Sequence, residues 1–218
     1  SNCKNLQSIT IPTSVTSIGD SAFSGCALLQ SITIPTSVTS TDHSKFWNLF
    51  KFRSSNFNNK NVKYVSKDGI LFTRDGKKLL CFPANHELSH YIIPTSVTSI
   101  GNYAFSHCSN LQSISIPTSV TSIGDHAFSE CSQLMSVTIP ASVTSIGDSA
   151  FSKCHDLRSI IVNNANPKYI SANGILFTKD YKRLLCFPKN SHFSTYTIPP
   201  SVESIDDATF YFYSILVS

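Results

Sequence analysis

Hydrophobic and polar residues recur along this chain at a fixed interval. The repeated pattern is L-x-x-I-x-I-P-x-S-V-x-S-I-G-x-x-A-F-x-x-C, and its first position is always apolar. That position falls at Leu6, Leu29, Phe52, Leu88, Leu111, Leu134, Leu157, Phe193 and Leu216. Successive anchors are 23 residues apart (29 minus 6), except for two steps of 36 (88 minus 52 and 193 minus 157). A period of this length is typical of a solenoid, in which each coil packs only against its neighbours.

The alternation within one repeat predicts a short strand that faces the core. Leu111, Ile114 and Ile116 are expected to point inward, while Ser113 and Ser115 face solvent. The further inward positions of this repeat are Val120, Ile123, Phe128 and Cys131. Because the repeats follow one another without a linker, we expect residues 1–218 to form a single solenoid.

The second half of each repeat predicts a bend followed by a short helical turn. Gly124 permits the bend, and Asp125 is expected to cap a turn over residues 126–128. The repeat is therefore expected to be mostly β, with short helical turns between 23-residue coils.

The two 36-residue steps contain a passage that occurs twice. VKYVSKDGILFTRDGKKLLCFP, from position 62, returns as PKYISANGILFTKDYKRLLCFP from position 167. Asp68-Gly69 and Asn173-Gly174 are strong β-hairpin turn signals. A second turn contains Gly76, and because Tyr181 replaces it in the other copy, a different turn is expected there. We therefore expect two inserted antiparallel hairpins or meanders that project from the coil, in the equivalent regions 58–86 and 163–191, with residues 79–82 returning the chain to the stack.

Seven cysteines follow the repeat rather than a disulfide pattern. Cys3, Cys26, Cys108, Cys131 and Cys154 share one repeat position, and Cys81 and Cys186 share another. This phase predicts a ladder of buried small apolar side chains. No closely spaced CxxC pair is present, so no zinc site is expected.

Positive charge is concentrated in the two inserts. Residues 58–86 include six basic and two acidic residues, and residues 163–191 include five basic residues and one acidic residue. Each region therefore has a net charge of +4. The whole chain is also +4, which leaves −4 for everything else. The candidate ligand-binding residues are Lys63, Lys67, Arg74, Lys77, Lys78, Lys168, Lys179, Lys182 and Arg183.

Two interpretations of this charge stay open. The basic residues can form a bipartite site for polyanions, such as sulfated glycans or an acidic protein face. They can equally be solvating charges that protect exposed hairpin edges from aggregation. No nucleic-acid motif accompanies them, so no specific nucleic-acid partner is expected.

The plain repeats offer two other surfaces. Pairs of Ser and Thr at alternate strand positions predict hydroxyl columns on one sheet face, which more often mark a solvated strand face than a ligand site. Residues that vary between repeats lie near the turns, where specific contacts are expected. These variable pairs are 102–103, 106–107, 125–126, 129–130, 152–153 and 155–156.

Catalytic and membrane-spanning signatures do not stand out in the sequence. His107-Cys108 and Cys154-His155 are adjacent pairs, but each cysteine occupies a core position, where a thiol is unreactive. No catalytic, cofactor-binding or metal-binding residues are assigned, and an enzyme is not expected. No segment is apolar enough to form a transmembrane helix.

The repeat IPTSVTSIG…AFSxC, interrupted by DGILFTRDGKKLLCFP-type hairpins, resembles the BspA-like leucine-rich repeat (LRR) surface proteins over essentially the whole chain. The resemblance implies a right-handed LRR solenoid at the cell surface or secreted. It also implies adhesion to host cells and matrix proteins. The second repeat departs from the pattern at residues 41–47.

The combined expectation is a non-enzymatic surface protein that contacts host-cell or matrix macromolecules through its solenoid edges and basic hairpins. The alternative is a structural module that builds surface arrays by self-association. Both ends interrupt a repeat, and residues 211–217 are apolar. Flanking repeats are therefore expected beyond the ends, or the uncapped ends pair with another molecule.

Overall fold

The computed structural model describes most of the chain from residue 61 onward and parts of the chain before it. The described residues are 3, 5–19, 22–23, 26, 29, 31–38, 54–57, 61–189, 193–207 and 209–210, with only the backbone described at 31 and 54–57. The expectations for residues 41–47, for Phe52 and Leu216, and for the apolar C-terminal stretch lie outside these residues.

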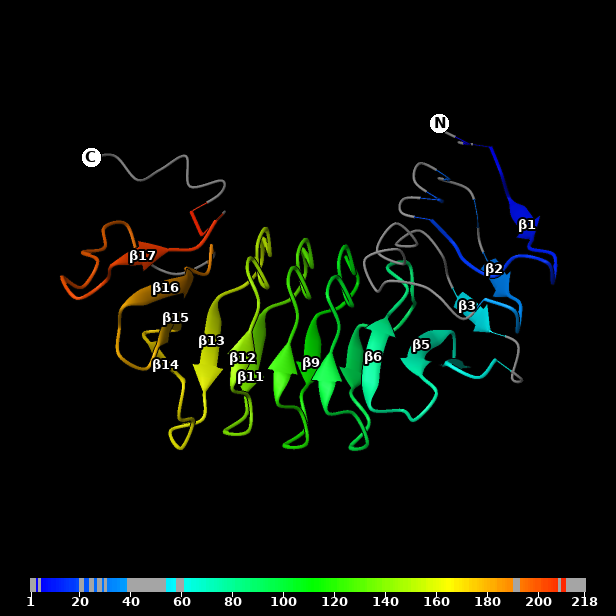
Figure 1. The fold of residues 1–218 in the computed structure, drawn as a ribbon. Helices are drawn as coiled ribbons and strands as arrows, with labels where there is room; N and C mark the ends of the chain where they lie inside the picture. Colours follow the sequence, from blue (N-terminus) through cyan, green and yellow to red (C-terminus); the bar gives the residue numbers. More distant parts are fainter. Residues whose placement is uncertain are drawn as a thin grey trace.

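Parallel strands stack along a solenoid (Figure 1). One sheet contains β7 (His90–Ile92), β9 (Ser113–Ser115), β11 (Ser136–Ile139) and β13 (Ser159–Val162). A second sheet contains β8 (Ser99–Ile100), β10 (Ser122–Ile123) and β12 (Ser145–Ile146). An N-terminal sheet contains β1 (Ser8–Thr10), β2 (Ser31–Ile34) and β3 (Ser54–Phe57). Paired residues such as Ser122 and Ser145 are one repeat apart, so the sequence period is the register of the sheets.

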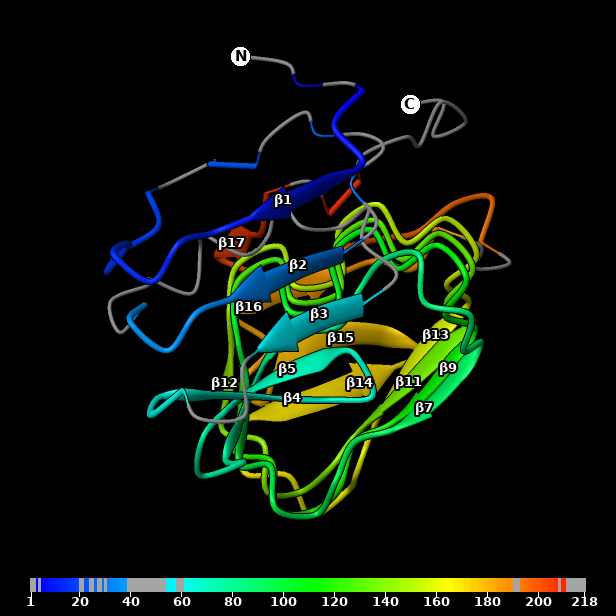
Figure 2. The ribbon, with the colours of Figure 1, turned by 90° about the vertical axis from the view of Figure 1, so that its right-hand side faces the viewer.

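The predicted inward positions form the core. Seen along the stack, the central coils superimpose, with the two parallel sheets on opposite sides and turns joining them along the upper and lower edges (Figure 2). Phe82, Phe105, Phe128 and Phe151 form a column with ring-centroid separations of 5.2, 5.1 and 5.4 Å. Each coil thus covers the apolar face of the next, and stacked aromatic rings add about 0.5–1.5 kcal/mol per pair beyond area burial.

The cysteine ladder is confirmed for five of the seven residues. Cys81, Cys108, Cys131, Cys154 and Cys186 are buried, and all seven cysteines are free thiols. Cys26 is only partly buried and Cys3 is exposed, which corrects the prediction for the two most N-terminal cysteines.

The expected short helical turns are absent from the described residues, which contain strands and turns but no helix. Hydrogen bonds inside a coil alternate with hydrogen bonds between coils. The Ala104 N–H donates to Gly101 O (3.2 Å), whereas the Phe105 N–H donates to Ala127 O of the next coil (2.7 Å). Because every second N–H is directed to the neighbouring coil, a continuous helix cannot form.

The predicted cap at Asp125 is also wrong. The Asp125 carboxylate accepts a hydrogen bond from the backbone N–H of Asp148 in the next coil (3.0 Å) and another from the Asn102 side chain (3.2 Å). The residue therefore connects three coils instead of capping its own turn.

Each insert is a three-stranded antiparallel meander. The first contains β4 (Tyr64–Lys67), β5 (Ile70–Thr73) and β6 (Lys78–Cys81). The second contains β14 (Tyr169–Ala172), β15 (Ile175–Thr178) and β16 (Arg183–Cys186). The predicted hairpin turns are confirmed, with Asp68 and Gly69 at φ 51° and 77°, and Asn173 and Gly174 at φ 53° and 81°.

The prediction that the inserts project from the coil is wrong. Strand β6 pairs in parallel with β8, and β16 pairs in parallel with β17 (Ser204–Ile205). Leu71 and Phe177 in the central strands are 0% exposed. The apolar I-L-F-T strands require burial, so the meanders lie within the stack and only their turns reach solvent.

The second turn has the same conformation in both inserts, contrary to the prediction. Gly76 has φ 68° and donates to Thr73 O (2.8 Å), and Tyr181 has φ 58° and donates to Thr178 O (2.9 Å). The ring of Tyr181 packs against Phe177 with a centroid separation of 5.3 Å. This contact and the turn hydrogen bonds hold a non-glycine residue in the left-handed region.

The first apolar anchor after each insert does not enter the core. Leu88 is 43% exposed and Phe193 is 36% exposed. Residues 79–82 do return the chain to the stack as predicted, because Leu79 pairs with Ile100 and the Phe82 N–H donates to Ala104 O (2.7 Å).

Candidate functional site

A groove runs across the turns that lead from β8, β10 and β12 to the strands of the other parallel sheet. These turns form the upper edge of the central coils in Figure 1. We call this groove the turn-edge groove, and its volume is about 610 Å³. Its lining residues are Asn102, Tyr103, Ser106, His107, Asp125, His126, Ser129, Glu130, Asp148, Ser149, Ser152, Lys153 and Asp207. Most of the residues that vary between repeats therefore lie together in one concave surface.

Six of these residues have a left-handed backbone although none is glycine. They are Tyr103 (φ 57°), His107 (61°), His126 (51°), Glu130 (62°), Ser149 (52°) and Lys153 (57°). The hydrogen bonds between coils impose this conformation, as when the Tyr103 N–H donates to Asp125 O (2.8 Å) and the His107 N–H to Ser129 O (2.8 Å). Such positions cost on the order of 1 kcal/mol each for non-glycine residues, and they are concentrated at functional sites.

Equivalent side chains contact each other across the coils of the groove. The rings of Tyr103 and His126 are stacked, with centroids 4.8 Å apart and an interplanar angle of 11°. Glu130 is within 2.8 Å of His107 Nδ1 and within 2.9 Å of Lys153 Nζ. These contacts fix the side chains in rows, which lowers the entropy lost when a ligand binds.

The groove is acidic overall. Four carboxylates, from Asp125, Glu130, Asp148 and Asp207, are accompanied by one lysine, Lys153. With neutral histidines the lining therefore carries −3, opposite in sign to the whole chain.

The thiols beneath the turns are not reactive groups. Burial raises the pKa of Cys131 and Cys154 well above the usual value of 9.0, so both remain protonated at neutral pH. The side chains of the groove can form hydrogen bonds, ion pairs and ring contacts with a ligand.

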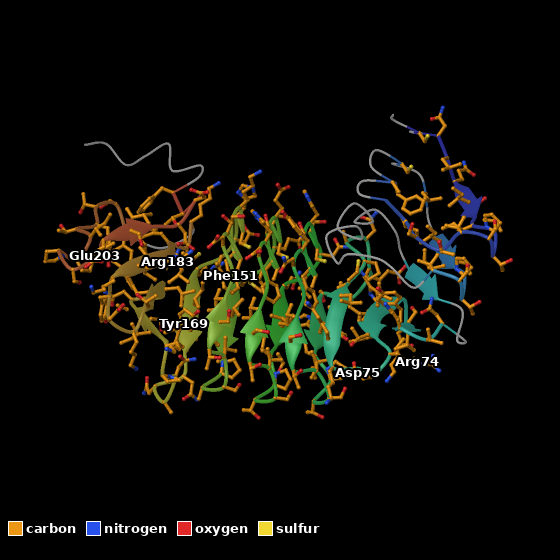
Figure 3. The ribbon with its side chains drawn as sticks, viewed as in Figure 1. Arg74, Asp75, Phe151, Tyr169, Arg183 and Glu203 are labelled. Carbon is orange, nitrogen blue, oxygen red and sulfur yellow. The ribbon has the colours of Figure 1, made fainter. Side chains whose placement is uncertain are left out.

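The basic candidates lie in two separate places. Figure 3 shows Arg74 and Asp75 on the side of the N-terminal coils, and Arg183 and Glu203 on the side of the C-terminal coil. In the first insert, Lys63 and Arg74 line a surface pocket of about 430 Å³ with Tyr64, Thr73 and Asp75. Lys63 immediately precedes β4, whereas Lys67 is the last residue of that strand, so the two lie at opposite ends of β4. The structure therefore does not unite the nine candidates in one patch.

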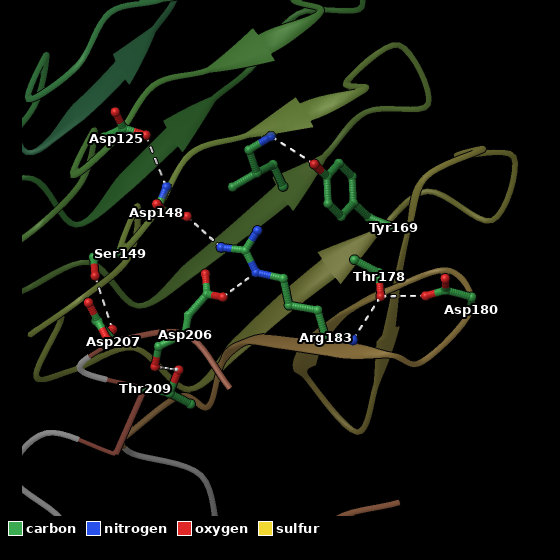
Figure 4. A network of polar contacts seen from close by, with 11 residues as sticks. Asp125, Asp148, Ser149, Tyr169, Thr178, Asp180, Arg183, Asp206, Asp207 and Thr209 are labelled. Atoms are coloured by element: carbon green, nitrogen blue, oxygen red, sulfur yellow. Dashed lines mark hydrogen bonds and ion pairs between the residues drawn. The ribbon is translucent and has the colours of Figure 1, made fainter. Parts of the chain in front are cut away.

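In the second insert, two candidates form ion pairs within the protein, and Figure 4 shows those of Arg183. Arg183 contacts Asp206 through Nε and Asp148 through Nη2, the latter at 2.5 Å. Lys182 Nζ lies 2.8 Å from Glu203 Oε1. Lys179 Nζ is 3.5 Å from Asn164 O. Lys168 is exposed.

Asp206 is the residue of this region that sequence reasoning missed. Asp206 is 8% exposed, and its Oδ2 atom has no hydrogen-bond partner among the described residues. Burial raises the pKa of Asp206, and this effect outweighs the attraction of Arg183, which itself has a pKa raised by its bonds to Asp206 and Asp148. The sequence signal was weak, because Asp206 occupies the glycine position of the repeat.

The residues described by the structure contain no helix long and apolar enough to cross a membrane. Within the same residues, no group of three or more His, Cys, Asp or Glu side chains is arranged to hold a metal ion.

Comparisons with solved structures identify the same fold. A leucine-rich repeat protein from Eubacterium ventriosum aligns with a TM-score of 0.68 at 21% identity, over 96% of this chain and 77% of that chain. The pneumococcal vaccine antigen PcpA aligns with a TM-score of 0.59 at 23% identity, over 89% of this chain and 46% of that one. A leucine-rich cell surface protein from Faecalibacterium prausnitzii aligns with a TM-score of 0.54 at 25% identity, over 91% of this chain and 59% of that chain.

The comparison with curated proteins gave no match. The profile of the BspA-type leucine-rich repeat region matches six copies of the repeat, over residues 1–71 and 80–179. These segments cover 71 and 100 residues of 218, which is more than half of the chain. With its 23-residue coils, its meander inserts and this match, the chain belongs to the BspA-type leucine-rich repeat family.

Proposed function

We propose that this chain is a non-enzymatic surface protein that binds host-cell or matrix macromolecules through its turn-edge groove and one of its two basic inserts. The observation that carries the proposal is the groove itself. Six non-glycine residues with left-handed backbones place varied side chains in one concave surface. Glycine would satisfy the same backbone at lower cost, and strained positions of this kind are concentrated at functional sites.

The family and one fold relative support the surface location. The Faecalibacterium prausnitzii protein is described as a leucine-rich cell surface protein, and the pneumococcal protein as a vaccine antigen. This chain spans 59% and 46% of those two proteins, respectively. Its location and partners are therefore part of the proposal.

The test compares groove and sheet-face variants in binding to immobilised matrix proteins and cultured host cells. The groove variant combines Tyr103→Ala with His126→Ala, which removes the stacked rings. The control combines Ser115→Ala with Thr138→Ala, two exposed positions on neighbouring strands of the sheet. We expect the groove variant to bind about tenfold more weakly, since aromatic side chains often dominate binding energy, and the control to bind like the wild type.

Two results would contradict the proposal. The first is that the wild-type protein binds neither cells nor matrix proteins at micromolar concentration. The second is that both variants lose binding equally. Size-exclusion chromatography of the same samples would show whether self-association accounts for any signal.

A further inference from the structure

The two inserts have similar sequences but different electrostatic surroundings. Residues 61–86 with the following coil segment 97–102 contain five basic and two acidic residues, a net charge of +3. The equivalent residues 166–191 with 202–207 contain five basic and four acidic residues, a net charge of +1. The lower net charge of the second region comes from the following coil, because residues 202–207 carry −3 whereas residues 97–102 carry no charge.

That coil supplies carboxylates that pair with two basic residues of the second insert. Glu203 pairs with Lys182, and Asp206 pairs with Arg183. The matching residues 105 positions earlier are Thr98 and Gly101, which carry no charge. Among the residues that the structure describes, no carboxylate forms an ion pair with Lys63 or Lys77.

The turn of the first insert fixes the backbone of its basic residues. Asp75 Oδ1 accepts hydrogen bonds from the Thr73 hydroxyl (2.6 Å) and the Lys77 N–H (3.0 Å). The Arg74 N–H donates to Lys63 O at 2.7 Å, which brings the two basic residues to the same end of the meander. Lys77 O accepts from the Thr98 N–H of the following coil at 2.7 Å. We call Lys63, Arg74 and Lys77 the first basic cluster.

We propose that the first basic cluster, and not its counterpart in the second insert, binds linear sulfated polysaccharide. This inference rests on the proposed function and names one ligand class for it. Three cations beside a shallow surface pocket suit a row of sulfate groups. Tyr64 in the same pocket is 4% exposed. Its ring is therefore not a stacking platform for bases, which disfavours single-stranded nucleic acid.

The experiment measures binding to immobilised heparin across a salt series. One variant combines Lys63→Gln with Lys77→Gln, and its matched control combines Lys168→Gln with Lys182→Gln at the equivalent positions. Both remove two positive charges, so a contribution from net charge alone is the same in each. We expect about tenfold weaker binding for the first variant, and a salt slope reduced by roughly 0.7–0.9 per cation removed, as for nucleic-acid polyanions. The control variant is expected to stay within about twofold of the wild type.

Several outcomes would overturn this inference. Equal losses in both variants would show that charge acts without a defined site, and absence of heparin binding by the folded wild type at low salt would remove the site altogether. Equal binding of desulfated heparin, polyglutamate or single-stranded DNA would contradict the sulfated ligand. Thermal unfolding of each variant verifies folding. If cell or matrix binding persists and depends on Tyr103 and His126 while heparin does not bind, the proposed function stands and this inference fails.

Discussion

A methyl group on Gly124 would lie 2.5 Å from the backbone nitrogen of Asn102 and 2.4 Å from its side-chain oxygen. Gly147 is in the same position one coil later, with the backbone nitrogen of Asp125 at 2.4 Å. At these two positions, glycine is therefore required by the close approach of the preceding coil. The sequence pattern predicted a bend at this position, but it could not show which backbone lies opposite.

Gly124→Ala is expected to destabilise the protein by about 1–3 kcal/mol, the usual cost of overpacking, because the new methyl group must displace the Asn102 backbone. Gly19→Ala is the matched control, since Gly19 has the same repeat position but no described atom within 4 Å of the place that a methyl group would take. Chemical denaturation of both variants measures the difference. Equal free energies of unfolding would contradict the explanation.

Tyr181 illustrates why single residues mislead when a turn is predicted from sequence. The loss of glycine predicted a new turn, yet Tyr181 adopts φ 58° and retains the hydrogen bond to Thr178. The same applies to the left-handed residues of the turn-edge groove, whose conformation comes from hydrogen bonds to another coil. Interactions 22 residues away in sequence, as from Tyr103 to Asp125, are invisible to local turn rules.

At the scale of the element, each insert begins at a buried asparagine. Asn166 donates from Nδ2 to Pro140 O (2.8 Å) and Val143 O (2.9 Å), and its Oδ1 accepts from the N–H groups of Lys168 and Tyr169 (both 2.8 Å). Asn61 makes the equivalent four hydrogen bonds in the first insert, at 2.9–3.1 Å. One side chain therefore joins the start of each meander to the preceding coil.

Asn166→Ala is expected to cost about 3 kcal/mol or more, because it leaves two carbonyls and two N–H groups unpaired in a buried site. Asn164→Ala changes an exposed neighbour and is expected to stay within about 0.5 kcal/mol of the wild type. The measurement is the free energy of unfolding in urea. A small cost at Asn166 would mean that water replaces the side chain.

For the meanders, the sequence predicted the strands and turns but not their place in the sheet. Strand content, the turns at Asp68 and Asn173, and the return of residues 79–82 to the stack were predicted. Their burial within the sheet was not, because an apolar run such as I-L-F-T has the same appearance in a projecting hairpin and in a buried strand. Tertiary pairing of β6 with β8 decides between them.

At the scale of the whole molecule, Arg183 connects three parts of the solenoid. It lies on β16, contacts Asp148 from an earlier coil, and contacts Asp206 after β17. The last described coil is thereby joined to the stack by a charge cluster as well as by β16–β17 pairing.

Arg183→Gln is expected to destabilise the protein by about 1–3 kcal/mol at pH 7, because Asp206 remains buried without its cation. The folded-state pKa of Asp206 is already above the usual 3.8, and the substitution raises it further. The variant is less stable than the wild type while its buried Asp206 is ionised in the folded state. This loss of stability disappears as pH falls through the raised pKa and the carboxyl becomes neutral. The difference between variant and wild type should therefore shrink as pH is lowered from 7 towards 4.

Lys182→Gln is the control, because its exposed pair with Glu203 contributes little. Unfolding free energies from pH 7 to pH 4 are the measurement. A constant difference between Arg183→Gln and wild type across that range would show that Asp206 does not titrate as described.

The sequence by itself determined the period, the inward residues of the plain repeats, the strand-rich coils and the presence of two equivalent inserts. These properties follow from hydrophobic spacing, which local chain geometry converts directly into a buried face. Only the tertiary structure decided that the inserts lie within the stack, that strained turns form a groove, and that the two basic inserts differ. Each of these depends on which atoms of one coil face the next, and that contact is set by stacking rather than by any segment alone.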